Sequence, residues 1–237
     1  MKYNLPVILL NGTVLLPQSE LKFEFEDEFS KNIIEEAEIF HDNKILIVTK
    51  SSLEENIIIR DLPKIGTVAE ITRKLELPNG KVRVVLKGKS RASIIEYLNP
   101  TKDIIESIIK IIPKEKISEE VKNGILKKLN TELHTYIERV PYMSNSLLSL
   151  ISDTDDLNTI TDIIVNHMPL ENKRLFDYLI EYRCIKRAEM ILEDIYKQQR
   201  LFNIEKNIDT KVKKELDKDQ KNVYRRWVKW QKLRYKI

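Results

Sequence analysis

Alternation of apolar and polar residues between Ile65 and Leu98 does more than any other feature to limit the folds open to this chain. Apolar side chains recur there at every second position, which predicts strands with one face in water. Pro78-Asn79-Gly80 interrupts the alternation with residues that favour a tight turn, so the segment predicts an antiparallel hairpin. Gly88 breaks the second strand and predicts a bulge or bend, followed by a third strand over Arg91–Tyr97.

An isolated hairpin is marginal in water, so further strands must come from the rest of the N-terminal half. Asp103–Ile112 fits a helix by the spacing of its isoleucine pairs, but six isoleucines in ten residues favour a strand. The other expected elements are strands over Leu5–Leu10, Leu21–Phe25 and Lys44–Lys50, and a short amphipathic helix over Phe29–Ala37.

The distribution of glycine predicts that the second half of the chain is helical. All five glycines lie in the first 124 residues. Helices are expected from Ser118 to Pro141, from the Asp153–Asp156 segment to Pro169, and over Glu171–Ile180. No proline or glycine occurs from Ile185 to the end, which predicts one long helix. Its apolar residues form a narrow row, too thin for a deep core: Ile204, Ile208, Val212 and Leu216.

The charge of the chain is concentrated at its C-terminal end. Residues 211–237 hold 11 Lys/Arg and 3 Asp/Glu, whereas residues 1–210 hold 30 and 34. Aromatic side chains alternate with the basic ones in this tail at Tyr224, Trp227, Trp230 and Tyr235. The first interpretation of this pattern is that the tail packs on a partner helix or results from an altered reading frame. Nucleic acid is the second interpretation and an anionic membrane surface the third.

Composition limits the compartment and the chemistry. A single cysteine, Cys184, excludes an internal disulfide and favours a reducing compartment. The apolar run at the N-terminus is too short for a signal peptide, and no run approaches the ~20 residues of a membrane span. We therefore expect a cytoplasmic protein with no membrane partner.

No motif for catalysis or metal binding is complete. Gly88-Lys89-Ser90 imitates the end of a phosphate-binding loop, but the required glycine five residues earlier is Arg83. The three histidines have no partner at metal-ligand spacing, so structural roles are expected. Cys184 has basic neighbours but no histidine nearby, which favours a small buried side chain over a nucleophile. No catalytic residue, cofactor or metal is predicted.

An ordered series of segments resembles the N-terminal domain of the ATP-dependent Lon protease family. The N-terminal pieces are LPVILLNGTVLLP, KILIVT and IGTVAEITRKLELPNGKVRVVLKGKSRASIIEYL. The helical piece begins IVNHMPLENKRLFDYLIEYRCIKRAEMILEDIYKQQR, and the resemblance covers roughly residues 5–224. After Tyr224 the sequence RRWVKWQKLRYKI departs from the family's leucine-rich continuation, which indicates a truncated or standalone domain.

The resemblance implies an α+β fold in two parts. A β-rich pseudo-barrel like the PUA domain is expected over residues 1–115, and a helical bundle ending in a long helix over residues 116–237. It also implies a module without the family's AAA+ ATPase and Ser-Lys peptidase, and therefore not an enzyme by itself.

The expected function is recognition of unfolded or degron-bearing polypeptides for ATP-dependent proteolysis. Self-association or docking on a full-length Lon homologue is a further expectation. The alternative is a nucleic-acid-binding protein that uses the PUA-like fold and the basic aromatic tail. The residues expected to contact a client or partner are Leu201, Phe202, Ile204, Ile208, Trp227 and Trp230.

Overall fold

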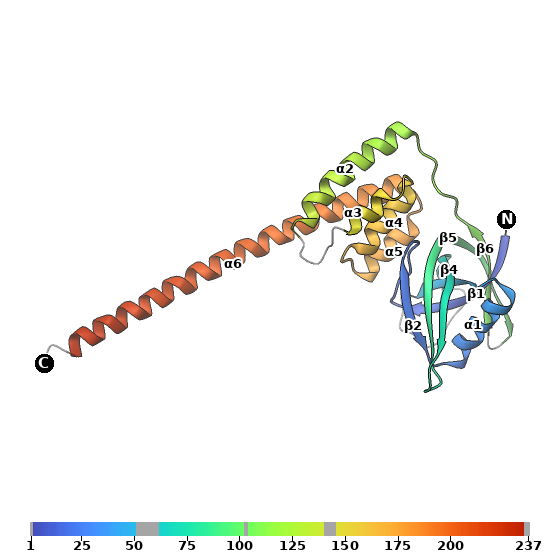
Figure 1. The fold of residues 1–237 in the computed structure, drawn as a ribbon, viewed down its shortest axis with the longest axis horizontal. Coiled ribbons are helices and arrows are strands. Elements are labelled where there is room, and N and C mark those ends of the chain that lie inside the picture. The colour runs from blue at the N-terminus through green and yellow to red at the C-terminus, as the bar shows by residue number, and fades with distance from the viewer. Residues whose placement is uncertain (1, 51–61, 102–103, 140–145, 235–237) are drawn as a thin grey trace. The chain divides into compact units, whose positions relative to one another are not determined.

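The computed structural model describes residues 2–50, 62–101, 104–139 and 146–234 (Figure 1). The chain forms two compact units, Met1–Ile191 and Leu192–Ile237. The first holds the strands and the shorter helices, and the second holds most of the long helix. A boundary inside the first unit near residue 115 stays a prediction.

Six strands in the described residues form one sheet in the order β2-β5-β4-β3-β1-β6. β5 also pairs with β6, which closes β1, β3, β4, β5 and β6 into a barrel and leaves β2 attached outside to β5. β1 and β3 run parallel, and the other neighbours are antiparallel. The strands are β1 (Lys2–Asn11), β2 (Glu20–Phe25), β3 (Lys44–Lys50), β4 (Ile65–Glu76), β5 (Val82–Thr101) and β6 (Ile104–Ile111). The expected β-rich half and its strands, including the ambiguous Asp103–Ile112 segment, are confirmed.

The hairpin forms as expected, but the separate third strand was wrong, because Arg91–Tyr97 continues β5. The break expected at Gly88 is a register shift: Ala69 pairs with Gly88 and Val68 with Ser90, so Lys89 is an extra residue in β5. Glycine is required there because a Cβ at Gly88 would lie 2.1 Å from the Leu16 carbonyl oxygen. A neighbouring loop thus explains the glycine, and the strand continues past it.

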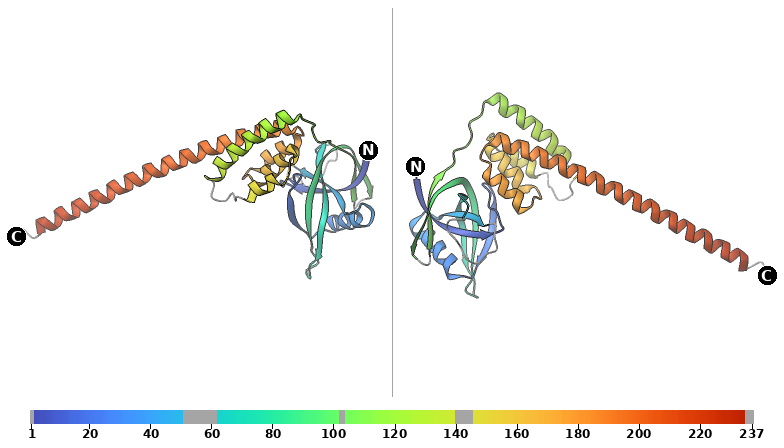
Figure 2. Two further views of the ribbon diagram at one scale, coloured as in Figure 1. Left: turned by 45° about the horizontal axis from the view of Figure 1, so that its top comes forward. Right: turned by 180° about the vertical axis from the view of Figure 1, so that it is seen from behind.

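Two apolar clusters hold the strand region together. The helix α1 (Glu28–Phe40) packs against β1, β3 and β6 and buries Ile33, Ile34 and Ala37 in the first cluster (Figure 2). The second cluster draws on all five barrel strands and therefore fills the barrel interior. Its buried members are Leu5, Val7, Leu46, Val48, Val68, Ala92, Ile94, Ile105 and Ile109.

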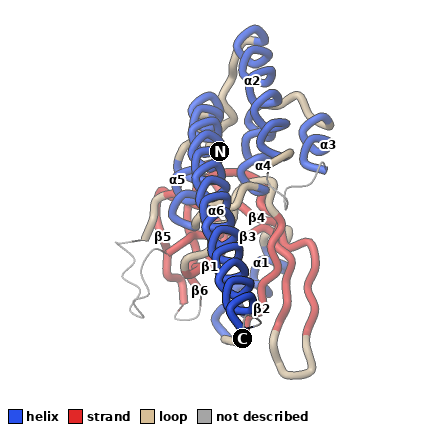
Figure 3. The backbone as a smooth tube through the Cα atoms, turned by 90° about the vertical axis from the view of Figure 1, so that its left-hand side faces the viewer, coloured by secondary structure: helices blue, strands red, loops and turns tan. Residues whose placement is uncertain are grey.

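The helices follow the expected start signals. Ser118 caps α2 (Glu119–Ile137) and Asp156 caps α4 (Leu157–His167), each through its side chain. The later helices are α5 (Asn172–Ile180) and α6 (Cys184–Arg234), so the uninterrupted final helix is confirmed (Figure 3).

The helical half also contains a short helix that the sequence did not indicate. The short α3 (Ser146–Ser152) was not predicted, because its seven residues, SLLSLIS, are too few to show a helical period. Pro141, the expected end of the first helix, and Tyr235 lie outside the described residues. No helix among the described residues is long and apolar enough to cross a membrane.

Candidate functional site

A pocket of about 400 Å³ opens at one end of the barrel. Strand pairing explains how it forms, because residues directly opposite one another in antiparallel strands share a face. Tyr3 of β1 pairs with Ile109 of β6, and Lys44 of β3 pairs with Glu70 of β4, all at the same end of the barrel. We call this the barrel-mouth pocket; it is lined by Tyr3, Leu5, Lys44, Val68, Glu70, Lys89, Ser90, Ile109 and Ile111.

The floor of the barrel-mouth pocket is apolar and its rim is charged. Leu5, Val68 and Ile109 belong to the interior cluster, and Ile111 packs against it half-buried. The bulge in β5 places Lys89 at the rim, where its ammonium pairs with the Glu70 carboxylate. Bulges commonly redirect a side chain in this way next to a binding site.

Lysines dominate the electrostatics of this rim. The hydrogen bond and charge of Lys89 lower the pKa of the Glu70 carboxyl, partial burial opposes this effect, and Lys44 and Lys87 lower the pKa further. Three ammonium groups therefore act on one carboxylate. An apolar concavity with a few polar groups is typical of binding sites. The lining residues contain no histidine or cysteine, so the pocket is suited to binding and lacks an obvious nucleophile–base pair.

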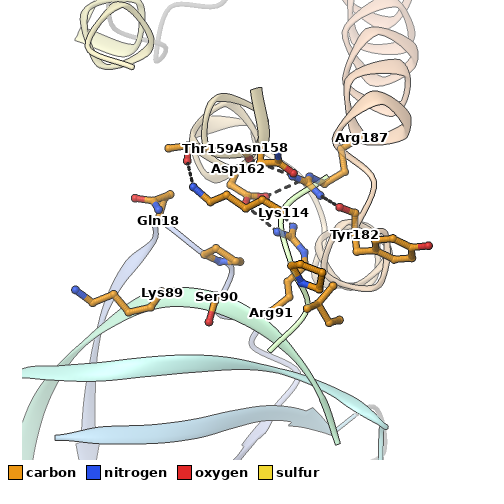
Figure 4. Close-up of a pocket in the computed structure, with 13 residues that line it drawn as sticks. Gln18, Lys89, Ser90, Arg91, Lys114, Asn158, Thr159, Asp162, Tyr182 and Arg187 are labelled. Atoms are coloured by element: carbon orange, nitrogen blue, oxygen red, sulfur yellow. Dashed lines mark hydrogen bonds and ion pairs between the residues drawn. The ribbon is translucent and has the colours of Figure 1, made fainter. Parts of the chain in front are cut away.

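A second, smaller cavity of about 50 Å³ lies between β5 and the helices (Figure 4). Two buried arginines and one buried aspartate dominate it. Arg91, on the outer face of β5, donates to both Asp162 carboxylate oxygens at 2.7 and 2.8 Å. Arg187, in the first turn of α6, approaches Asp162 Oδ1 at 3.4 Å. We call Arg91, Asp162 and Arg187 the buried ion cluster.

Backbone carbonyls use most of the remaining donors of the buried ion cluster. Arg91 donates to the carbonyls of Leu179 and Tyr178, at the end of α5. Arg187 donates to the carbonyls of Glu181 and Tyr182, in the turn that leads into α6, and to the carbonyl of Asn158 in α4. Burial lowers the pKa of Arg187, an effect that Arg91 adds to and Asp162 opposes. With its donors so occupied, the cluster holds α4, α5 and the start of α6 against β5 and is not arranged to bind a ligand.

Sequence reasoning missed this cluster, although a weak signal was present. Asp162 is a lone charge within the apolar segment TITDIIV, and Arg187 lies in CIKRAEMIL. A lone charge inside an apolar helix pattern indicates a buried partner. The identity of that partner is not visible, because Arg91 is 71 residues from Asp162 in sequence.

Cys184 and His41 are described residues whose side chains, a thiol and an imidazole, can take part in catalysis or metal binding. Cys184 is buried, and burial together with the hydrogen bond and charge of Glu115 raises the pKa of its thiol to about 12, which disfavours the nucleophilic thiolate. His41, expected to be structural, lies near Glu36 and Glu106, with their potential ligand atoms within 4.8 Å of one another. Glu106 already accepts a hydrogen bond from Asn4. Sequence spacing did not show this group because β6 supplies its third member.

The expected contact residues lie on α6, where every described side chain from residue 200 to 227 is exposed. Leu201 and Ile204 are 51% and 54% exposed, so packing in the core of the chain is not their role. Phe202, Ile208 and Trp227 are also exposed, and the Trp227 ring stacks on Tyr224. The side chain of Trp230 lies outside the described part. A role for these residues in contacts stays a prediction.

The first unit is thus a closed barrel followed by helices, with an apolar pocket at the mouth of the barrel. Comparison with known proteins gives its family. The ATP-dependent protease La (LON) substrate-binding domain matches residues 4–196. The chain belongs to this family.

Relatives and solved structures agree. The Lon protease of Brevibacillus choshinensis is 30% identical over 226 residues, which are 95% of this chain and 29% of the relative. Lon protease 1 of Bacillus subtilis (strain 168) is 26% identical, with the same coverage. The N-terminal domain of a Mycobacterium avium complex Lon protease has a TM-score of 0.67 at 17% identity and covers 82% of this chain and 98% of its own. The chain thus spans less than a third of the length of these curated relatives.

Proposed function

We propose that this chain is a non-catalytic recognition module of ATP-dependent proteolysis that binds unfolded or degron-bearing polypeptides. The family is named for substrate binding, and it covers both the barrel and the helices up to residue 196. The observation that carries the proposal is the barrel-mouth pocket, an open concavity of about 400 Å³ with an apolar floor. Unfolded polypeptides present apolar side chains that can be buried there, whereas folded proteins mostly hide them.

The buried ion cluster supports such a role because it keeps the helices fixed on the barrel. A binding surface that is already formed loses less conformational entropy on association than one that must order itself. The exposed aliphatic side chains of α6 add apolar surface that can contact the same client or a second copy of the chain.

The test is binding of a fluorescent, permanently unfolded protein such as reduced, alkylated casein. Ile111→Asp places a charge on the floor of the pocket and is expected to weaken binding at least about tenfold, because transferring an unpaired charge into an apolar contact is costly. Ile95→Asp is the matched control. Ile95 is an isoleucine of the adjacent strand β5, is 49% exposed and lies outside the lining residues.

Thermal unfolding of both variants shows whether the fold is retained. Binding that is unchanged in folded Ile111→Asp contradicts a role for the pocket. If wild type binds unfolded protein and this binding tolerates added salt, recognition of polypeptide is supported. If wild type binds nucleic acid and this binding weakens steeply as salt is added, the alternative function is supported. No hydrolysis of ATP and no cleavage of casein are expected from the chain itself.

A further inference from the structure

We propose that the barrel-mouth pocket selects an apolar side chain that is adjacent to a carboxylate in the bound polypeptide. This inference rests on the proposed function and adds a chemical preference to it. The carboxylate can come from an aspartate or glutamate of the client or from its C-terminus. The two sources share one chemistry, and the experiment separates them.

Positive charge exceeds negative charge at the rim of the pocket. Lys44, Lys87 and Lys89 act on the single carboxylate of Glu70, and Lys89 is its direct partner. Among the described residues, the further partner of Lys44 is Asp42, at 3.7 Å, and the Asp42 side chain is 92% exposed. A pair so open to solvent is weak. A carboxylate at the rim can therefore pair with the Lys44 ammonium group, whose interaction with Asp42 is weak.

These charges lie directly beside the apolar floor of the pocket. Lys44 and Glu70 face each other across β3 and β4, one step beyond the paired residues Leu46 and Val68 of the interior cluster. Lys89 lies beside them on β5, and Ile109 and Ile111 lie on β6. A ligand that buries an apolar side chain against Val68 and Ile111 thus brings its neighbouring groups to the lysines.

The bulge in β5 places a cation at the rim. Val68 pairs with Ser90 and Ala69 with Gly88, and the extra residue between them is a lysine whose ammonium reaches the rim. Because Gly88 has no side chain, the Leu16 backbone can approach β5 directly beside this irregularity. The local backbone is therefore arranged so that a cation stands at the mouth.

The experiment measures fluorescence anisotropy of three short peptides on the full chain. All three contain the same phenylalanine. In the first peptide aspartate follows it and the C-terminus is amidated; in the second asparagine replaces the aspartate; in the third the phenylalanine is the last residue and has a free carboxylate. Wild type is expected to bind the first or the third peptide up to about fivefold more tightly than the second peptide. This factor corresponds to the stabilisation that an exposed ion pair contributes.

The double variant Lys44→Gln with Lys89→Gln is expected to bind all three peptides equally. Lys110→Gln is the matched control, since Lys110 is an exposed lysine of β6 that lies between Ile109 and Ile111 in sequence and points to the opposite face. It is expected to keep the preference. Added salt should reduce the preference and leave the binding of the neutral peptide largely unchanged.

The outcomes separate this inference from the proposed function. Equal binding of all three peptides by wild type, with loss of binding in Ile111→Asp, overturns the carboxylate preference and leaves the proposed function intact. If Lys110→Gln loses the preference as fully as the double variant does, the carboxylate site is also overturned. The overall positive charge of the surface would then be the cause of the preference. If wild type binds neither the peptides nor unfolded casein, the proposed function fails as well.

Discussion

At the scale of single residues, the buried ion cluster is the interaction on which the arrangement of the first unit depends most. Two guanidinium groups share one carboxylate, and Arg91, Asp162 and Arg187 are 7%, 5% and 1% exposed. Arginine stays protonated in proteins, so both cations must be compensated inside the fold. The carbonyls at the end of α5 provide part of that compensation, and Asp162 provides a formal negative charge that contacts both guanidinium groups.

Asp162→Asn is expected to lower the free energy of unfolding by about 3–5 kcal/mol, because it leaves two buried cations without a counter-charge. Urea unfolding followed by circular dichroism measures this loss. Asp155→Asn is the control, since Asp155 is exposed just before α4. A loss in Asp162→Asn as small as that in the control would show that the carbonyls alone satisfy the arginines.

The N-cap of α4 predicts a specific dependence on pH. Burial raises the pKa of the Asp156 carboxyl, but hydrogen bonds from Lys114, Thr159 and Asn158 outweigh it and lower the pKa from 3.8 to about 2. A depressed carboxyl pKa stabilises the fold above the unfolded value and loses this contribution as the pH falls from 3.8 to about 2. Asp156→Asn is therefore expected to flatten the decline in stability within this window. A decline as steep in the variant as in wild type would assign it to other groups.

At the scale of elements, the long strand β5 connects most of the first unit. Its first half pairs with β2 and β4, and its second half pairs with β4 and β6, so it closes the barrel. Next to the bulge, Gly88 exchanges backbone hydrogen bonds with the loop before β2, at 2.9 Å to Ser19 and 3.0 Å from Gln18. The same strand carries Lys89 to the barrel-mouth pocket and Arg91 to the buried ion cluster.

Gly88→Ala is expected to destabilise the chain by about 1–3 kcal/mol, the cost of overpacking, because the new methyl group would overlap the Leu16 carbonyl. Gly124→Ala is a matched control in helix α2, where a Cβ meets nothing within 4 Å. It should be neutral or stabilising, since alanine favours helices. Thermal unfolding compares the two, and an equal change in both would contradict the close approach of the loop.

The exposed row on α6 predicts self-association. Ile204, Ile208, Val212 and Leu216 are about half exposed, and a helix with one thin apolar edge gains stability by burying it. Burial of each contributes roughly 1.5–3 kcal/mol before the costs of association, which suits dimers of about micromolar affinity. Ile208→Asp should abolish them, whereas Asn207→Asp, with the same charge on another side of the helix, should not. Sedimentation showing a monomer at every concentration, with α6 intact, would contradict this role.

At the scale of the whole molecule, protection of the backbone differs between the two units. The first contains the clusters of the barrel and the buried ion cluster. The segment between β6 and α2 is also tied down, because Glu115 exchanges backbone hydrogen bonds with the Asn158 side chain and accepts one from the Ile185 amide. In the second unit the described side chains from residue 200 to 227 are exposed.

Limited trypsin digestion is therefore expected to cut residues 200–234 before the strands and helices described in the first unit, because local opening exposes that part of α6 at little cost. Mass spectrometry of the earliest products identifies the sites. Early cleavage at Lys114 or Lys116 would show instead that the hydrogen bonds of Glu115 do not protect the connection. Early cleavage inside β4 or β5 would contradict the barrel as the stable core.

The sequence by itself determined the local elements of this protein. Alternation predicted the hairpin, Ser118 and the Asp153–Asp156 segment marked helix starts, and the absence of proline and glycine after Ile185 predicted α6. Such signals act over a few residues, because strand and helix periods are set by neighbouring dihedral angles. Only the tertiary structure decided the rest. Three interactions join residues that are far apart in sequence: closure of β5 on β6, the contact of Gly88 with Leu16, and the pairing of Arg91 with Asp162. Each residue has several possible partners, and the packing of the folded chain selects among them. The barrel-mouth pocket depends on five strands at once, so no single segment could indicate it.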